Sequence, residues 1–287
     1  MDSTRLLRAS VKTDDERAIV GLDKLISPIK SGASKVAQGA EATRLNVWLL
    51  KIKTAVGAFT KLKLDQGVDK ALSSPNLKTL SNYVDMLKKK YPDNQVSVVE
   101  TLTAKYGEAA VAKGLVTAKR ATNSKDIATK LQAEQLHGWL NSEKSVNDVF
   151  MLLKIADDGV LFAISRKMET LDEYIKLFNT ENPQRQTNLF RALRDGFGED
   201  KFIVVVAKAM TLPKTAVAAR GFQKTLFKRW INQDYDPASI YVKVFKVPEN
   251  NMGSVTSEMK LVNRLYGEVY YRAKTIDVTT VVDPRHV

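Results

Sequence analysis

An internal repeat of 91 residues constrains the fold of this chain more than any other feature of its sequence. The chain has three tryptophans, Trp48, Trp139 and Trp230, and each lies 91 residues from the next. A repeat of this length predicts similar units that stack end to end around one continuous core, which makes an elongated tandem array. Other residues keep the same offset without gaps: Phe59, Phe150 and Tyr241; Leu62, Leu153 and Val244; Leu80 and Leu171; Tyr83 and Tyr174; Pro92 and Pro183; Leu102 and Leu193; Gly107 and Gly198.

Apolar residues within each unit recur every three or four positions, which is the period of an α-helix. One such helix ends at each tryptophan, and Ser145 and Pro237 are typical of the start of the helix that follows. A later helix carries Tyr83 or Tyr174 and ends at a proline. Gly107 and Gly198 suit left-handed helix caps, each followed by a glutamate at a helix N-terminus. Strand-like alternation is scarce, so we predict an all-α fold. In the last unit Leu265 occupies the strict tyrosine position, with Tyr266 beside it.

Charge and composition limit the classes of function. The 45 Lys and Arg residues exceed the 32 Asp and Glu residues, and the net charge of +13 favours nucleic acid, acidic proteins or anionic membrane surfaces as partners. The absence of cysteine excludes disulfides, thiolate zinc sites and cysteine nucleophiles. The sequence contains no apolar run of about 18 residues, so it predicts no membrane-spanning helix. The first seventeen residues lack the apolar segment of a signal peptide.

Catalytic and metal-binding motifs are weak. His137 lies in a tryptophan helix, where a structural histidine is favoured over a lone catalytic base, and His286 is next to the last residue. The paired carboxylates of Asp157-Asp158-Gly159 fit a turn between helices. The sequence contains no GxGxxG, Walker A or HExxH motif. We therefore predict a protein that is not an enzyme and that has no cofactor and no metal site.

Clusters of basic residues are compatible with a second class of function. Lys51-Ile52-Lys53, Lys88-Lys89-Lys90 and Lys228-Arg229 could bind phosphates, although solvated helix faces also account for them. The alternative function is accordingly that of a basic helical protein that binds nucleic acid or an anionic surface.

Two short motifs near the start resemble the leader of a known family. Arg5-Leu6-Leu7-Arg8 reads R-x-L-R, and Asp14-Asp15-Glu16-Arg17 follows as an acidic element in which Asp15 stands where glutamate is more usual. Together they resemble the RXLR-dEER leader of secreted oomycete effectors of the Phytophthora type. The body is similar to the WY and LWY repeat modules of the same family. The tryptophan helix matches the W part, L-x-x-Y-[VI] the Y part and L-x-x-x-[YF]-G-E the L part.

The resemblance implies a domain plan and a role for each motif. Residues 1–43 would be a flexible leader, 44–92 a WY unit, 93–183 and 184–275 two LWY units, and 276–287 a C-terminal tail. The leader motifs carry over as translocation and processing residues: Arg5, Leu7, Arg8, Asp14, Asp15, Glu16 and Arg17. The repeated aromatic residues carry over as structural core: Trp48, Tyr83, Trp139, Tyr174 and Trp230.

The resemblance also implies a function. Such a protein would be secreted by a plant pathogen, enter the host cytoplasm or nucleus, and bind a host plant protein to suppress immunity without catalysis. Some tandem LWY proteins dock the scaffold subunit of protein phosphatase 2A, so this subunit is the specific candidate partner. Nucleic acid is a less favoured partner than a host protein. The sequence assigns no partner-binding residues and no oligomeric state.

Overall fold

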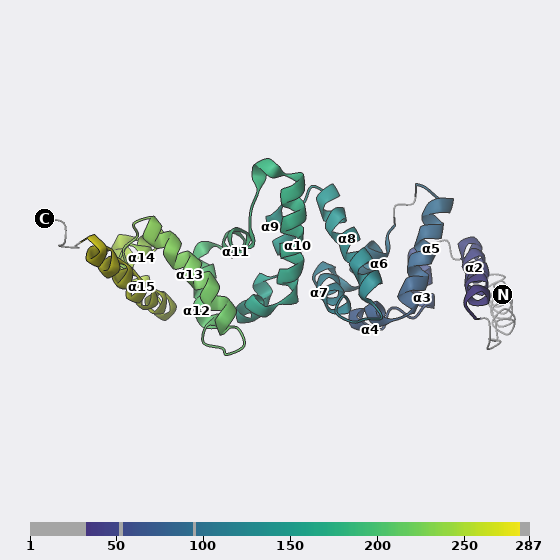
Figure 1. Ribbon diagram of the computed structural model, residues 1–287, viewed down its shortest axis with the longest axis horizontal. Coiled ribbons are helices and arrows are strands. Elements are labelled where there is room, and N and C mark those ends of the chain that lie inside the picture. The colour runs from purple at the N-terminus through teal and green to yellow at the C-terminus, as the bar shows by residue number, and fades with distance from the viewer. Residues whose placement is uncertain (1–32, 52–53, 94–95, 282–287) are drawn as a thin grey trace, which may run out of the picture. The chain divides into compact units, whose positions relative to one another are not determined.

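The computed structural model describes residues 33–51, 54–93 and 96–281. In these ranges every regular element is a helix and none is a strand (Figure 1), so the predicted all-α fold is confirmed. The described residues form two compact units. The first takes the residues up to Lys63 together with Lys78–Ser97, and the second takes Leu64–Leu77 and the residues from Val98 onward.

The first unit contains α2 (Ala33–Lys51), α3 (Ala55–Lys61) and most of α5 (Asn76–Lys90). Helix α2 begins at Ala33, so the predicted leader boundary at residue 43 lies inside a helix. The first half of this segment contains Ala33, Ala37, Ala40 and Ala42, and alanine has the highest helix propensity of any residue.

Trp48 and Tyr83 form the centre of the first unit. Their ring centroids lie 6.1 Å apart at an interplanar angle of 72°, which is an edge-to-face contact. The Tyr83 hydroxyl donates a hydrogen bond of 3.3 Å to the Trp48 carbonyl oxygen. Buried aliphatic side chains from all three helices surround the pair: Leu45, Leu49, Ala58, Leu80, Val84 and Leu87.

The second unit contains the remaining helices. They are α4 (Val68–Ser73), α6 (Val98–Tyr106), α7 (Glu108–Ala118), α8 (Lys125–Asn141), α9 (Val146–Leu152), η1 (Ala156–Ile164), α10 (Arg166–Glu181), η2 (Pro183–Arg185), α11 (Leu189–Phe197), α12 (Glu199–Ala209), α13 (Ala216–Asn232), α14 (Ile240–Lys243), η3 (Glu249–Ser254) and α15 (Ser257–Val281). One continuous cluster of buried apolar residues runs through this unit from Ala112 to Tyr266.

Two tryptophan–tyrosine pairs lie in the core of the second unit. Trp139 meets Tyr174 with centroids 5.8 Å apart at 79°, and Trp230 meets Tyr266 with centroids 5.2 Å apart at 84°. The tyrosine that meets Trp230 is therefore Tyr266, while Leu265 is only partly buried. The preceding segment also departs from strict register, because α14 begins at Ile240 and Pro237 stays in a turn rather than opening the helix.

An aromatic cluster joins α9, η1, α11 and α12. The Phe197 ring lies 5.3 Å from both the Phe150 and the Phe162 rings and stacks on Phe202 at 5.6 Å. Gly196 lets α11 approach this closely, because a Cβ atom at that position would lie 2.5 Å from a carbon of the Phe150 ring. The cluster thus holds successive helices of the second unit together through specific close packing.

Gly107 and Gly198 adopt the same backbone conformation, with φ/ψ of 82°/153° and 81°/139°. This region is almost exclusive to glycine, but its ψ differs from that of the predicted left-handed cap. Each glycine is followed by the glutamate that begins the next helix, Glu108 in α7 and Glu199 in α12, as the sequence predicts. A carboxylate in the first turn interacts favourably with the helix dipole.

Candidate protein-docking surface

The aromatic residues that the sequence assigns to the core are closed to ligands. Tyr83, Tyr174 and Trp230 have no exposed surface, and Trp48 and Trp139 are 9% and 5% exposed. The seven leader residues Arg5, Leu7, Arg8, Asp14, Asp15, Glu16 and Arg17 lie outside the described residues.

Tyrosine hydroxyl groups tie the core to neighbouring turns. Tyr174 donates to the carbonyl of Lys144, and Tyr266 donates to the carbonyl of Tyr235. Burial, with a smaller contribution from the Asp148 charge, raises the pKa of Tyr174 to about 12. Burial also raises the pKa of Tyr266. Both phenols therefore stay protonated and keep donating well above neutral pH, which is a structural role rather than a catalytic one.

The candidate carboxylates and His137 lie in the second unit, whereas His286 is outside the described residues. Asp158 forms an ion pair with Lys167, with 2.5 Å between Oδ1 and Nζ, and this pair ties η1 to the start of α10. His137 is exposed on α8. Within the part of the chain that the structure describes, no three His, Cys, Asp or Glu side chains gather to hold a metal ion, and no helix is long and apolar enough to cross a membrane.

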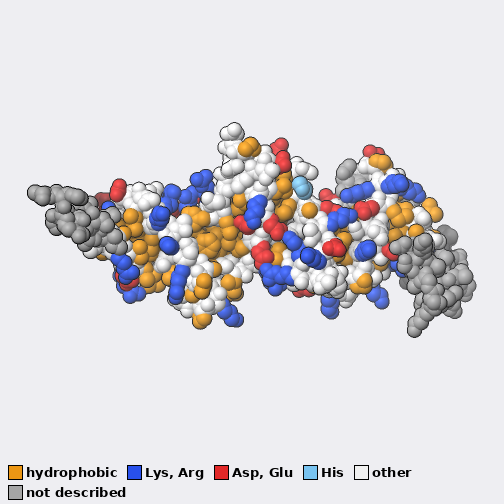
Figure 2. Space-filling model, viewed as in Figure 1, with side chains coloured by type: hydrophobic (Ala, Val, Ile, Leu, Met, Phe, Trp, Pro, Cys, Tyr) orange, Lys and Arg blue, Asp and Glu red, His pale blue; other side chains and the backbone are white. Residues whose placement is uncertain are grey.

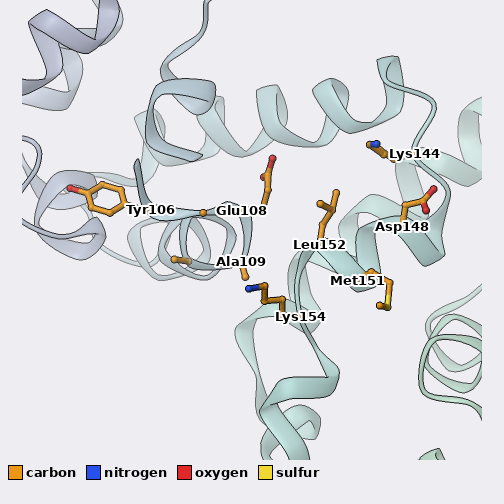
Figure 3. Close-up of a pocket in the computed structure, with 10 residues that line it drawn as sticks. Tyr106, Glu108, Ala109, Lys144, Asp148, Met151, Leu152 and Lys154 are labelled. Carbon is orange, nitrogen blue, oxygen red and sulfur yellow. The ribbon is translucent and has the colours of Figure 1, made fainter. Parts of the chain in front are cut away.

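A groove in the second unit lies between the start of α7 and helix α9 (Figure 3). It has a volume of about 660 Å³ and is lined by Tyr106, Gly107, Glu108, Ala109 and Ala110 on one side and by Lys144, Asp148, Met151, Leu152 and Lys154 on the other. Figure 3 shows Tyr106 and Asp148 at opposite ends, with Glu108, Leu152 and Lys154 between them. The lining of the groove therefore combines apolar side chains with charged side chains of both signs.

Hydrogen bonds position the two carboxylates of this groove. Asp148 Oδ2 accepts hydrogen bonds from the Ser145 backbone nitrogen at 2.8 Å and from its hydroxyl at 2.7 Å. These two bonds lower the pKa of the Asp148 carboxyl, and Ser145 is the N-cap of α9, as predicted. Glu108 Oε2 accepts from Gln135 Nε2 at 3.1 Å. Each of the two carboxylates therefore has its own hydrogen-bond partner.

Tyr106 closes one end of the groove and also fixes the chain that precedes α4. Its hydroxyl donates to the Leu64 carbonyl and accepts a hydrogen bond of 3.2 Å from the Gly67 backbone nitrogen. Burial raises its pKa. Met151 is the most exposed apolar residue of the groove, at 61%. Methionine is one of the residues that are enriched in protein–protein interfaces.

Sequence reasoning did not find this groove. Met151 could have been identified from the helical phase of α9, which buries Val146, Val149 and Phe150 and turns Met151 outward. The approach of the α7 N-terminus to α9 has no local signal. The predicted basic cluster at Lys228-Arg229 separates in the structure, because Lys228 is exposed while Arg229 Nε lies 4.0 Å from Glu199 Oε2.

Comparison with known proteins identifies relatives. No family model matches the chain. An RxLR effector protein of Phytophthora infestans is 37% identical over 246 residues, which cover 84% of this chain and 46% of the relative. A second RxLR effector protein of that organism is 37% identical over 92% of this chain and 38% of the relative. RxLR effector protein PSR2 of Phytophthora sojae is 28% identical over 82% of this chain and 37% of its own length. The chain thus spans less than half the length of these curated relatives.

A solved structure is similar in fold. The crystal structure of PcRxLR12 matches with a TM-score of 0.61 at 24% identity, over 83% of this chain and 57% of that one. At this identity the match supports the helical fold.

Proposed function

This chain is a homologue of the RxLR effector proteins of Phytophthora, and we propose that it is a secreted virulence effector that acts inside plant host cells by binding a host protein. The observation that carries the proposal is the 37% identity to an RxLR effector over 84% of the chain. The RXLR-dEER-like residues between Arg5 and Arg17 supply the matching leader. In this proposal they serve secretion and delivery to the host cytoplasm or nucleus.

We propose that the body consists of three copies of one module with the 91-residue period, a WY unit at 44–92 and LWY units at 93–183 and 184–275, between a leader and a tail at 276–287. The three tryptophan–tyrosine pairs support this, because each meets edge to face. Left-handed residues also keep the offset, with Glu143 and Asp234 at φ of 54° and 53°. Trp48, Tyr83, Trp139, Tyr174 and Trp230 are then scaffold residues.

The host partner is proposed to bind the exposed surface of the helices without catalysis. The groove lined by Glu108, Met151 and Lys154 supports a protein partner, because it offers apolar and charged groups together. The more specific proposal is that adjacent LWY units dock the scaffold subunit of protein phosphatase 2A. It rests on the resemblance to tandem LWY proteins.

The second candidate is a basic protein that binds nucleic acid or an anionic surface. The net charge of +13 favours it. The two candidates differ in their response to salt. Each phosphate contact lowers affinity by about 0.9 log units per log unit of salt, whereas a packed protein interface loses less.

Expression of the full chain in plant leaf cells tests the proposed function. We expect a reduced immune response to a pathogen elicitor and increased pathogen growth. The matched control replaces both Trp139 and Trp230 with alanine. This variant loses two core side chains, whereas its surface residues are unchanged. An immune response that stays unchanged while folded protein accumulates would reject the proposal, and an equal effect from the control would show that the folded surface is not responsible.

A further inference from the structure

A segment without acidic residues covers α12 from its third residue onward and all of α13. From Lys201 to Gln233 the chain has no Asp or Glu. It has seven basic residues there: Lys201, Lys208, Lys214, Arg220, Lys224, Lys228 and Arg229. The segment 91 residues earlier, 110–142, has five basic residues and two acidic ones, Asp126 and Glu134. The net charge is therefore +7 in one segment and +3 in the other, so the segment 91 residues earlier does not share the excess.

Three of these residues form one line on α13, and we call Arg220, Lys224 and Lys228 the basic stripe. They are four residues apart, so they lie on one helix face about 6 Å from each other along the axis. All three are exposed, and Val217, on the same face, is 81% exposed. In Figure 2 blue and orange side chains gather over α12 and α13, with little red among them.

The basic stripe has no internal charge partner. None of its residues forms an ion pair with any residue that the structure describes, whereas Lys208 pairs with Glu258 at 3.1 Å. Like charges one helix turn apart repel each other and destabilise an isolated helix. The stripe therefore costs stability that a negatively charged partner would recover.

The fold itself does not require the stripe. The corresponding positions on α8, 91 residues earlier, hold Thr129, Ala133 and His137, and α8 is a helix of the same length. The buried face of α13 is separate, with Ala219, Leu226, Phe227 and Trp230. The three charges of the basic stripe therefore lie on the outer face of α13 and are not needed to form the helix.

Gly221 lies within the same face. A Cβ atom there would meet nothing within 4 Å, so packing does not demand glycine. Glycine inside a helix costs roughly 0.5–1 kcal/mol relative to alanine. Its presence between Arg220 and Lys224 is explained if another backbone approaches the helix closely at this point.

We propose that the basic stripe docks an acidic helical segment of a partner protein. Carboxylates one turn apart on that segment would match the 6 Å spacing of Arg220, Lys224 and Lys228, and Val217 would take an apolar side chain at one end. Single-stranded nucleic acid fits less well, because α13 exposes no large aromatic side chain for base stacking. A membrane surface fits less well too, because the apolar face of α13 is buried in the core. This inference rests on the proposed protein-binding function and specifies the chemistry of the partner.

A binding measurement with a defined probe tests the stripe. The probe is a labelled synthetic helical peptide with one glutamate per turn on a single face and one leucine at its end. Fluorescence anisotropy gives its affinity for the full chain. The test variant is Arg220→Gln, Lys224→Gln and Lys228→Gln together, and the matched control is Thr129→Glu, Ala133→Glu and His137→Glu, which changes the net charge by the same amount on α8.

We expect the test variant to bind the peptide about tenfold more weakly and the control to bind within about twofold of the unchanged chain. Both variants should remain folded, since all six positions are exposed. The test variant should melt slightly above the unchanged chain because it removes like-charge repulsion, and the control should melt slightly below it because it adds such repulsion. Equal losses in the two variants would overturn the proposal, because net charge alone would then explain binding.

Two further probes separate the sources of negative charge. They are single-stranded RNA and vesicles that contain anionic lipid. The assignment to a protein partner would be overturned if either probe bound the chain more tightly than the peptide does and lost that affinity in the test variant. If the peptide fails to bind while the unchanged chain still suppresses the leaf immune response, the stripe inference falls and the proposed function stands.

Discussion

Replacing Trp230 with alanine is expected to lower the free energy of unfolding by about 3–5 kcal/mol. The side chain is fully buried, and its ring meets Tyr266 at 5.2 Å and Phe227 at 5.4 Å. Its Nε1 donates a hydrogen bond of 2.5 Å to Glu199 Oε1. The substitution therefore creates a cavity and also removes a donor from a partly buried carboxylate, and both effects destabilise the fold.

Thermal melting followed by circular dichroism measures this loss. Met151→Ala is the control, because Met151 is 61% exposed and its truncation should change stability by less than about 0.5 kcal/mol. A melting temperature of Trp230→Ala equal to that of the control would show that the tryptophan is not in the core.

Gly196→Ala is expected to destabilise the protein by about 1–3 kcal/mol, although it adds only one methyl group. The added Cβ would lie 2.5 Å from the Phe150 ring, so α11 would have to move away from α9. That movement would also disturb the contact between Phe150 and Phe197.

Gly221→Ala is the matched comparison for Gly196→Ala. The Gly221 site is open, and the same substitution there should raise stability by up to about 1 kcal/mol. Opposite signs for the two glycines are the expected outcome in urea unfolding. A Gly196→Ala protein as stable as the unchanged chain would contradict the close approach of α11 to Phe150.

The helical secondary structure and the burial of the aromatic residues could be predicted from the sequence because both depend on local periodicity. Trp139 and Tyr174 each belong to an amphipathic helix, so their burial follows from helical phase. The sequence does not decide between Leu265 and Tyr266, because the chain between Asp234 and Lys246 departs from strict register. The structure decides it, since the Tyr266 ring contacts Trp230.

Features that depend on two distant segments could not be predicted. The need for glycine at Gly196 arises from Phe150, 46 positions earlier in the chain, and α11 alone carries no sign of it. The groove needs Glu108 and Met151 on opposite walls. An ion pair such as Lys119–Glu173, at 2.9 Å, likewise links helices far apart in the sequence. The basic stripe is different, because its four-residue spacing is visible in the sequence, and only its exposure and lack of ion pairs required the structure.

The folded helical surface is proposed to bind a host protein. Affinity capture of the full chain from plant-cell extract at moderate salt, after nuclease treatment and with mass spectrometry of the bound material, tests it most directly. We expect one stoichiometric protein partner whose binding survives nuclease and salt, and recovery of the phosphatase 2A scaffold subunit would support the more specific proposal. Capture that disappears with nuclease or with salt would contradict the claim and favour a basic surface that binds nucleic acid or anionic material.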